Sequence, residues 1–391
     1  MNSNKNILII AKAYNSNKSA RAIQMTRVIN ALISFTDLSI TLITESNVND
    51  IEKKKNLEVY YIKQELFSFF GKKKMFGMLL NDIIFLRKQT FINNGITIAR
   101  RIIKEKNIGT IMTVSTPFDA HSIGLVIKSE NPKVKWITFF SDIWPLSLAP
   151  KPYDENKFSA RIKYKKAQKV IEQCEGIITP SIYTIDIIKS NFKPFAKMIS
   201  VPHCIGNRSI LRDKVIPGFI VHSGIISKER INEALIIAIK ELAAENPNFK
   251  GLIQIGPVHK QFQKLINKHK CSNIFTLGHL PEIVANNIQS QFEIGLIIEA
   301  PMKELSPFMP SKITDIIQLN RKVVSITPSK SVLSDFSRKY KGIFCCEYTK
   351  DAIKQCIVEA LTSDEIISND SMDIFRPEII AESYLKFINS I

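Results

Sequence analysis

Cysteine is scarce in this chain, and long apolar runs are missing. The 391 residues include six cysteines, and none of them stands in a C-x-x-C pair or at the Cys/His spacing of a zinc site. This excludes a disulfide-stapled scaffold and favours reduced, mostly buried thiols in a cytosolic protein. No apolar run approaches the ~18 residues of a transmembrane helix, and the first apolar stretch is shorter than the ~7 to 15 residues of a signal-peptide core. We therefore expect a soluble or peripheral protein.

Several nucleotide, hydrolase and metal motifs are also absent. The sequence contains no G-x-x-x-x-G-K-[ST], no G-x-S-x-G, no H-E-x-x-H and no EF-hand loop. These absences disfavour a P-loop NTPase, an α/β-hydrolase and a zinc protease. The sequence also has no D-x-D between predicted strands, a pattern that holds a diphosphate through a divalent metal. We therefore expect neither a metal ion nor a cofactor.

Acidic residues are too few to balance the basic ones. The chain has 54 Lys and Arg against 36 Asp and Glu, a net charge of +18. Residues 1–200 hold 31 basic and 16 acidic residues, whereas residues 201–391 hold 23 and 20. An anionic partner of the first half explains this excess, and so does a Lys-rich composition. A net positive charge alone does not indicate a nucleic-acid partner, and none is expected.

The length and the apolar pattern predict two α/β domains. A single core stops growing near ~250 to 300 residues, so 391 residues imply more than one. Short Ile- and Val-rich runs alternate with helical patterns, which is typical of parallel, doubly wound sheets. The predicted strands are Ile7–Ala11, Ser39–Ile43, Leu57–Ile62, Thr110–Val114, Lys135–Phe140, Gly176–Thr179, Met198–Pro202, Phe219–His222, Gly251–Ile255, Ile274–Leu277, Ile294–Ile298, Lys322–Ile326 and Gly342–Cys345. We place the domains at 1–204 and 205–374, and a final helix with Pro377 in its first turn at 375–391.

Several segments together resemble the retaining glycosyltransferases of the GT-B fold, in particular the family 4-like enzymes of bacterial cell-surface polysaccharide synthesis. The segments are Ser19–Ala22, Thr113–His121, Phe140–Pro145, Val221–Gly224, and Glu304–Asp315 followed by Arg321–Val324. The resemblance implies two Rossmann-like domains that face each other across a cleft. The first domain is then expected to bind an acceptor and the second a nucleotide sugar.

On the acceptor side, the resemblance points to two loops at the ends of neighbouring strands. Ligands of open α/β sheets bind at such ends. His121 begins the helix after the first loop, and Asp142 lies on the second. A lone histidine at a helix start is more often structural, and the matching place of Asp142 is what favours a role. His121 and Asp142 are therefore the predicted catalytic residues.

On the donor side, the resemblance assigns a glycine, a cation and a helix start to the diphosphate. Gly224 lets the backbone approach a phosphate, and either Lys228 or Arg230 neutralises it. Proline suits the first turn of a helix, whose amides attract anions. The remaining donor-side predictions are Pro310, Ser311 and Lys312 at the diphosphate, Asp315 at the ribose, Glu304 as a displaced acid with Glu299 as its alternative, and Gly256 and His279 near the base.

One region combines aromatic residues with a lysine cluster. It runs from Gln64 to Phe91 and includes Phe69, Phe70, Lys72, Lys73, Lys74 and Phe76. Aromatic rings partition into the boundary of a bilayer while ammonium groups meet lipid phosphates. An ordinary core helix beside a solvated lysine turn is the other interpretation. The first one predicts contact with an anionic membrane surface, on the inner face of the plasma membrane.

Taken together, these features predict transfer of a sugar from a nucleotide sugar to a glycan or lipid-linked glycan, as in capsule, O-antigen or other lipopolysaccharide synthesis. Two rival functions stay open: a nucleotide-sugar epimerase or hydrolase of the same fold, and a non-catalytic glycan-binding or scaffold subunit. The donor sugar, the base, the acceptor and the oligomeric state are not encoded in recognisable motifs.

Overall fold

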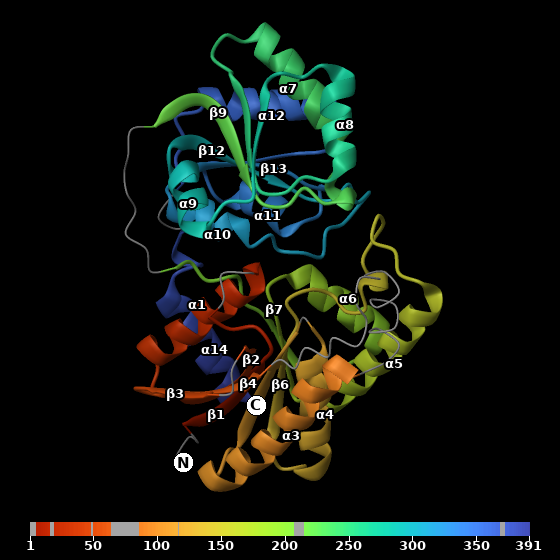
Figure 1. Ribbon diagram of the computed structural model, residues 1–391, viewed down its shortest axis with the longest axis vertical. Helices are drawn as coiled ribbons and strands as arrows, with labels where there is room; N and C mark the ends of the chain where they lie inside the picture. Colours follow the sequence, from red (N-terminus) through yellow and green to blue (C-terminus); the bar gives the residue numbers. More distant parts are fainter. Residues whose placement is uncertain are drawn as a thin grey trace.

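The computed structural model describes residues 5–15, 19–47, 50–63, 86–115, 117–206, 215–367 and 372–391. Two sheets of mostly parallel strands, each flanked by helices, form two domains that lie one above the other in Figure 1. The predicted residues 69, 70, 72, 73, 74 and 76 of the Phe- and Lys-rich region lie outside the described residues. Among the described helices, none combines the length and apolar character needed to cross a bilayer.

The first domain is built on a sheet with the strand order β3-β4-β2-β1-β5-β6-β7-β8. Its strands are β1 Asn6–Ala11, β2 Ser39–Ser46, β3 Asp50–Lys54, β4 Leu57–Lys63, β5 Thr110–Val114, β6 Lys135–Phe139, β7 Gly176–Thr179 and β8 Lys197–Ser200. The central strand β1 pairs in parallel with β2 and β5, and residues 7 to 11 of it are buried. Ile and Val suit such strands because both faces of a parallel sheet are covered by helices.

Helices cover both faces of this sheet. They are α1 Ala20–Phe35, α3 Leu86–Lys106, α4 Asp119–Glu130, α5 Lys157–Gln173, α6 Ile182–Phe192 and α14 Pro377–Ser390, with a short 3-10 turn at Leu146–Leu148. One core joins α3, α4, α5 and α6 to the sheet, and another joins α1 and α14 to its opposite face. The last helix of the chain thus packs on α1 of the first domain, as Figure 1 shows.

The second domain is built on a sheet with the strand order β11-β10-β9-β12-β13-β14. Its strands are β9 Ile216–Ser223, β10 Gly251–Ile255, β11 Ile274–Gly278, β12 Phe292–Ile298, β13 Lys322–Ile326 and β14 Ile343–Cys346. Its helices are α7 Glu233–Glu245, α8 Lys260–His269, α9 Glu282–Ser290, α10 Lys312–Gln318, α11 Val332–Lys339 and α12 Lys350–Thr362, with a 3-10 turn at Lys228–Arg230. The two sheets confirm the predicted α/β fold of two Rossmann-like domains.

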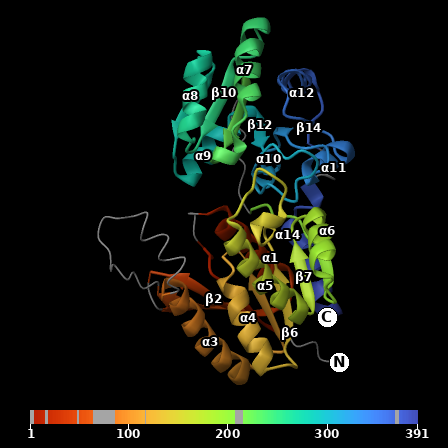
Figure 2. The ribbon, with the colours of Figure 1, turned by 90° about the vertical axis from the view of Figure 1, so that its right-hand side faces the viewer.

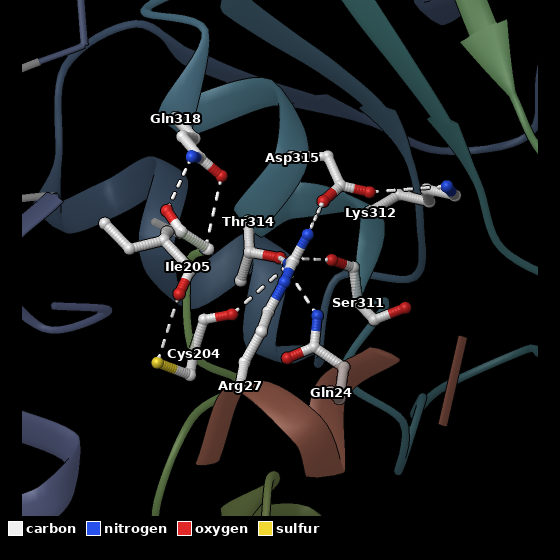
Figure 3. Close-up of polar contacts among 10 residues, drawn as sticks. Gln24, Arg27, Cys204, Ile205, Ser311, Lys312, Thr314, Asp315 and Gln318 are labelled. Carbon is white, nitrogen blue, oxygen red and sulfur yellow. Dashed lines mark hydrogen bonds and ion pairs between the residues drawn. The ribbon is translucent and has the colours of Figure 1, made fainter. Parts of the chain in front are cut away.

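The domains contact each other through a buried polar cluster. Arg27 of α1 donates from Nη2 to Asp315 Oδ1 at 2.8 Å and from Nη1 to Thr314 Oγ1 at 3.1 Å, both on α10. Gln24 donates to the same Thr314 hydroxyl at 3.2 Å. Within the second domain, Gln318 of α10 donates to the carbonyl of Gly206, at the start of that domain, at 2.6 Å. Figure 3 shows the Arg27 side chain extending from α1 into this cluster, which fixes α10 of the second domain against the first.

The six cysteines are all free thiols, and four of them are buried: Cys174, Cys204, Cys271 and Cys356. Burial raises the pKa of the Cys174 thiol to about 12, so this group stays protonated at neutral pH. The prediction of unpaired, mostly buried thiols is thereby confirmed.

Candidate active site

A cavity of about 400 Å³ lies between the two domains. The first domain supplies α1 and the loop after β6, including Arg21, Asp142 and Tyr153. The second domain supplies the 3-10 turn after β9 and the segment between β12 and α10, including Arg230 and Glu299. A ligand in this cavity therefore touches both domains at the carboxyl ends of their strands, where open α/β sheets bind ligands.

On the first domain's side, an arginine and a carboxylate are held together. Arg21 donates from Nη2 to Asp142 Oδ2 at 2.5 Å and from Nε to Ser141 Oγ at 2.8 Å. Ser141 in turn donates to the carbonyl of Ser115 at 2.9 Å. The Asp142 side chain is 41% exposed. Arg21 thus holds one side of the Asp142 carboxylate, and the carboxylate can still accept a hydrogen bond from a ligand hydroxyl.

On the second domain's side, Arg230 lies close to two ionisable groups, the half-buried Tyr153 phenol and the buried Glu299 carboxyl. Burial raises the pKa of the Tyr153 phenol, and Arg230, which shares a hydrogen bond with that phenol, opposes the rise. Burial also raises the pKa of the Glu299 carboxyl, while hydrogen bonds from Ser306 and Thr327 and the charge of Arg230 act against it. The Thr327 hydroxyl donates to Glu299 Oε1 at 2.6 Å. Arg230 is therefore a cation at the wall of the cavity, placed to meet a further anion.

Three glycine turns pack against one another at the ends of β9, β10 and β11. Gln254 donates to the carbonyl of Gly224 at 2.9 Å, and the amide of Gly256 donates to the carbonyl of Gly278 at 2.7 Å. Gly256 has φ +114°, and a Cβ there would stand 2.4 Å from the Gly224 carbonyl oxygen. Only glycine fits such a place. These turns make a compact edge of the sheet but do not line the cavity.

The whole architecture matches solved glycosyltransferases. It is similar to sucrose-phosphate synthase from Thermosynechococcus elongatus, with a TM-score of 0.69, 10% identity and 98% of both chains covered. It is also similar to Anabaena HepE in complex with UDP and glucose, with a TM-score of 0.65, 11% identity and coverage of 98% of this chain and 100% of that one. The lipopolysaccharide outer core galactosyltransferase WaaB matches with a TM-score of 0.62, 12% identity and coverage of 98% and 99%.

The chain has the GT-B glycosyltransferase fold. No sequence family matches it, and no curated protein sequence matches it. The predicted fold resemblance is thereby confirmed. Sequence identities this low show a shared fold and do not show a shared activity.

Some of the predicted site residues line the cavity, and others lie outside it. Four predicted residues line it: Asp142, Arg230, Pro310 and Ser311. The cation after Gly224 that reaches the cavity is Arg230, whereas Lys228 is exposed outside it. Likewise Glu299 reaches the cavity and the exposed Glu304 does not. His279 is exposed and also lies outside the cavity.

Asp315 and Lys312 lie at the domain contact, and not at the cavity wall. Asp315 is bound by Arg27, and Lys312 Nζ lies 3.3 Å from its Oδ2 atom. The helix α10 begins at Lys312, so Pro310 precedes its first turn. The expected place of Pro310 in the first turn is therefore corrected, whereas the expected role of Asp315 at a ribose stays a prediction.

His121 differs most from its expected place. Its side chain is fully buried, and its Nδ1 atom lies 2.7 Å from Thr113 Oγ1. The rings of Phe118 and Phe140 each lie 4.9 Å from the imidazole, centroid to centroid, and Nε2 has no hydrogen-bond partner. Burial lowers the pKa of His121 to about 3. The expected role at the acceptor does not fit this position, because the imidazole lies in the core of the first domain and does not reach the cavity.

Arg21 and Tyr153 line the cavity but were not among the predicted site residues. Arg21 stands in the first loop that carries the resemblance, so its sequence position was a usable signal. Tyr153 lies in the long segment between β6 and α5, which has no periodicity and so gave no signal. Only the return of this segment to the cleft brings the phenol to Arg230.

The buried histidines predict a fold that is sensitive to mild acid. Burial lowers the pKa of His121 to about 3 and that of His222 to about 4, against an ordinary value of 6.5. Below that ordinary value the unfolded chain binds protons that the folded chain cannot. Each histidine then costs the fold up to about 1.4 kcal/mol per pH unit. The unfolded histidine is only half protonated at pH 6.5, so we expect the free energy of unfolding, measured with urea, to fall by roughly 2 kcal/mol for the pair between pH 6.5 and 5.5.

The variant His121→Phe isolates one contribution to this pH dependence. Burial raises the pKa of Glu299, which acts in the opposite direction as the pH falls, so the wild-type profile alone is not decisive. The variant is expected to lose the His121 share of the slope, whatever its absolute stability. An unchanged slope below pH 6.5 would contradict the assignment of a neutral, buried imidazole.

Proposed function

We propose that this protein is a retaining glycosyltransferase that moves a sugar from a nucleotide-diphosphate sugar to a glycan or lipid-linked glycan. The observation that carries the proposal is the cavity shared by the two domains, with an Arg21–Asp142 pair on one wall and Arg230 on the other. A bisubstrate reaction needs such a place, since both reactants must be held in contact.

The donor belongs on the wall of the second domain. When the nucleoside diphosphate leaves, negative charge develops on its phosphates. A guanidinium stabilises that charge through bidentate hydrogen bonds. Arg230, Pro310 and Ser311 all line the cavity, and Gly224 and Gly256 follow the ends of β9 and β10 in the same domain. In this proposal Arg230 meets the diphosphate, without a metal ion, and the turns at these two glycines approach the nucleoside.

The acceptor belongs on the wall of the first domain. Asp142 is oriented by Arg21, and its open oxygen accepts a hydrogen bond from the attacking hydroxyl. Apolar side chains, among them Trp144 and Phe139, complete this wall and suit the faces of a sugar ring. The proposed setting is cell-surface polysaccharide synthesis at the inner face of a bacterial plasma membrane, with a lipid-linked acceptor.

A non-catalytic glycan-binding subunit is the second candidate. It is favoured by the burial of His121 and by the engagement of Asp315 with Arg27, since both were expected to serve the reaction. Binding of a donor with no turnover on any acceptor would support it. Nucleotide-sugar turnover without acceptor would instead support an epimerase or hydrolase.

The proposal is tested by a thermal-shift screen of the purified protein with UDP, GDP, CDP and their sugar conjugates. A ligand that binds only the folded state at ~100 times its dissociation constant adds about 2.7 kcal/mol of stability. We expect one base to raise the melting temperature by several degrees and the matching nucleoside without phosphates to have little effect. No shift with any of them, from a folded sample, would contradict the donor site.

A further inference from the structure

The helix α5, Lys157–Gln173, presents apolar side chains to solvent. Phe158 is 75% exposed and Ile162 is 43% exposed. The Asn156 side chain caps this helix by accepting hydrogen bonds from the amides of Phe158 and Ser159, which fixes Phe158 in the first turn. The helix lies at the edge of the first domain, beside α4 and α6 (Figures 1 and 2).

Cations follow the exposed apolar residues along the same face. Phe158, Ile162, Lys165 and Lys169 recur at the helical spacing and are all exposed, so they form one stripe. The buried residues Ala167, Val170 and Ile171 lie on the opposite side of the helix, against the core. The exposed cations of this helix are Lys157, Arg161, Lys165, Lys166 and Lys169, against the single exposed acid Glu172.

A second basic helix shows what an ordinary solvated face looks like. The helix α8 of the second domain exposes Lys260, Lys264 and Lys268. Its apolar residues Phe262 and Ile266 are buried in the core of that domain. Solvation of lysines explains α8 completely. It does not explain α5, where a phenyl ring and a branched aliphatic side chain stand among the cations on the outer face.

We propose that the outer face of α5 binds an anionic lipid surface. Apolar side chains in the centre of a cationic face insert at the boundary between headgroups and acyl chains. Lysines then reach from the sides to the lipid phosphates, with their methylene stems against the bilayer. This pairing distinguishes a membrane from a nucleic acid or an acidic protein, since those partners meet the charge but give Phe158 and Ile162 no apolar phase.

The position of α5 links this surface to the cavity. The helix begins four residues after Tyr153, and the preceding segment also places Trp144 and Leu146 at the cavity wall. A membrane held by α5 would therefore lie on the domain that the proposed function assigns to the acceptor, which is where a lipid-linked glycan would arrive. The inference thus deepens that proposed function, but its test needs no transfer activity.

Sedimentation with vesicles tests the proposal. The full chain is mixed at low salt with vesicles of phosphatidylcholine alone or of phosphatidylcholine with phosphatidylglycerol. We expect binding only to the anionic vesicles. Two variants, Phe158→Ser with Ile162→Ser, and Lys165→Glu with Lys169→Glu, should each weaken that binding by about tenfold or more. The matched control Lys260→Glu with Lys264→Glu, on α8, should bind like the wild type.

Equal binding by the α5 variants and the wild type would overturn the proposal, as would wild-type binding that does not depend on anionic lipid or no wild-type binding at all. The substituted side chains are exposed, so the fold is expected to persist, and thermal unfolding of each variant verifies it. The donor screen separates the two proposals. A nucleotide shift without vesicle binding overturns only the lipid surface, and vesicle binding without a nucleotide shift overturns only the transferase.

Discussion

Replacing Arg230 with alanine is expected to lower kcat/KM for the nucleotide sugar by about two orders of magnitude. Among the described residues that line the cavity, Arg230 is the one arginine or lysine that the second domain contributes. Its removal leaves the charge of a departing diphosphate without its guanidinium. Because that charge grows in the transition state, the loss should appear in kcat as well as in donor affinity.

Lys228→Ala is the matched control for this prediction. Lys228 belongs to the same 3-10 turn and carries the same charge, but it is exposed and lies outside the cavity. Steady-state kinetics of the two variants therefore separate a specific contact from the general positive potential. We expect the kcat/KM of Lys228→Ala to stay within a few-fold of the wild-type value. Losses of equal size in both variants would contradict a specific role of Arg230.

Replacing Arg27 with methionine is expected to destabilise the folded protein by about 3 to 5 kcal/mol. The side chains of Arg27 and Asp315 are only 9% and 17% exposed, so they form a largely buried pair across the two domains. Burial alone would raise the pKa of Asp315, but the charges of Lys312 and Arg27 lower it below its ordinary value. Without Arg27, a buried carboxylate keeps only Lys312 as its cation. Urea unfolding, followed by circular dichroism, measures the loss.

An exposed ion pair provides the comparison. Lys5 and Asp37 are 60% and 73% exposed, so Lys5→Met should cost far less stability than Arg27→Met. The second variant Asp315→Asn leaves the buried Arg27 guanidinium without its carboxylate, so it too should cost more than Lys5→Met. A loss from Arg27→Met no larger than that from Lys5→Met would mean that the pair does not hold the domains together.

The strands were predictable because their signal is local. Both ends of each predicted run lie within three residues of the ends of an observed strand, since Ile and Val side chains of a parallel strand are buried on both faces. The strand β3, Asp50–Lys54, was missed. It pairs antiparallel with β4 at the edge of the sheet, and its sequence DIEKK is polar because the strand is mostly exposed.

The candidate site was less predictable because contacts between the domains determine which residues line it. Asp142 and Arg230 were found from loops that follow strands, a place that the fold itself directs toward the cleft. Nothing in the local sequence of Asp315 reveals that Arg27, far away in the chain, binds its carboxylate. Similarly, the His121 imidazole is enclosed by Phe118 and Phe140, whose rings approach it only in the folded domain.

The central claim is that a nucleotide sugar binds in the cavity between the two domains. The most direct measurement is a crystal structure with the nucleoside diphosphate that gives the largest thermal shift. The account predicts that the diphosphate contacts the Arg230 guanidinium, with the nucleoside toward the turns of Gly224 and Gly256. A nucleotide bound away from Arg230, or on a surface of one domain outside the cavity, would contradict it.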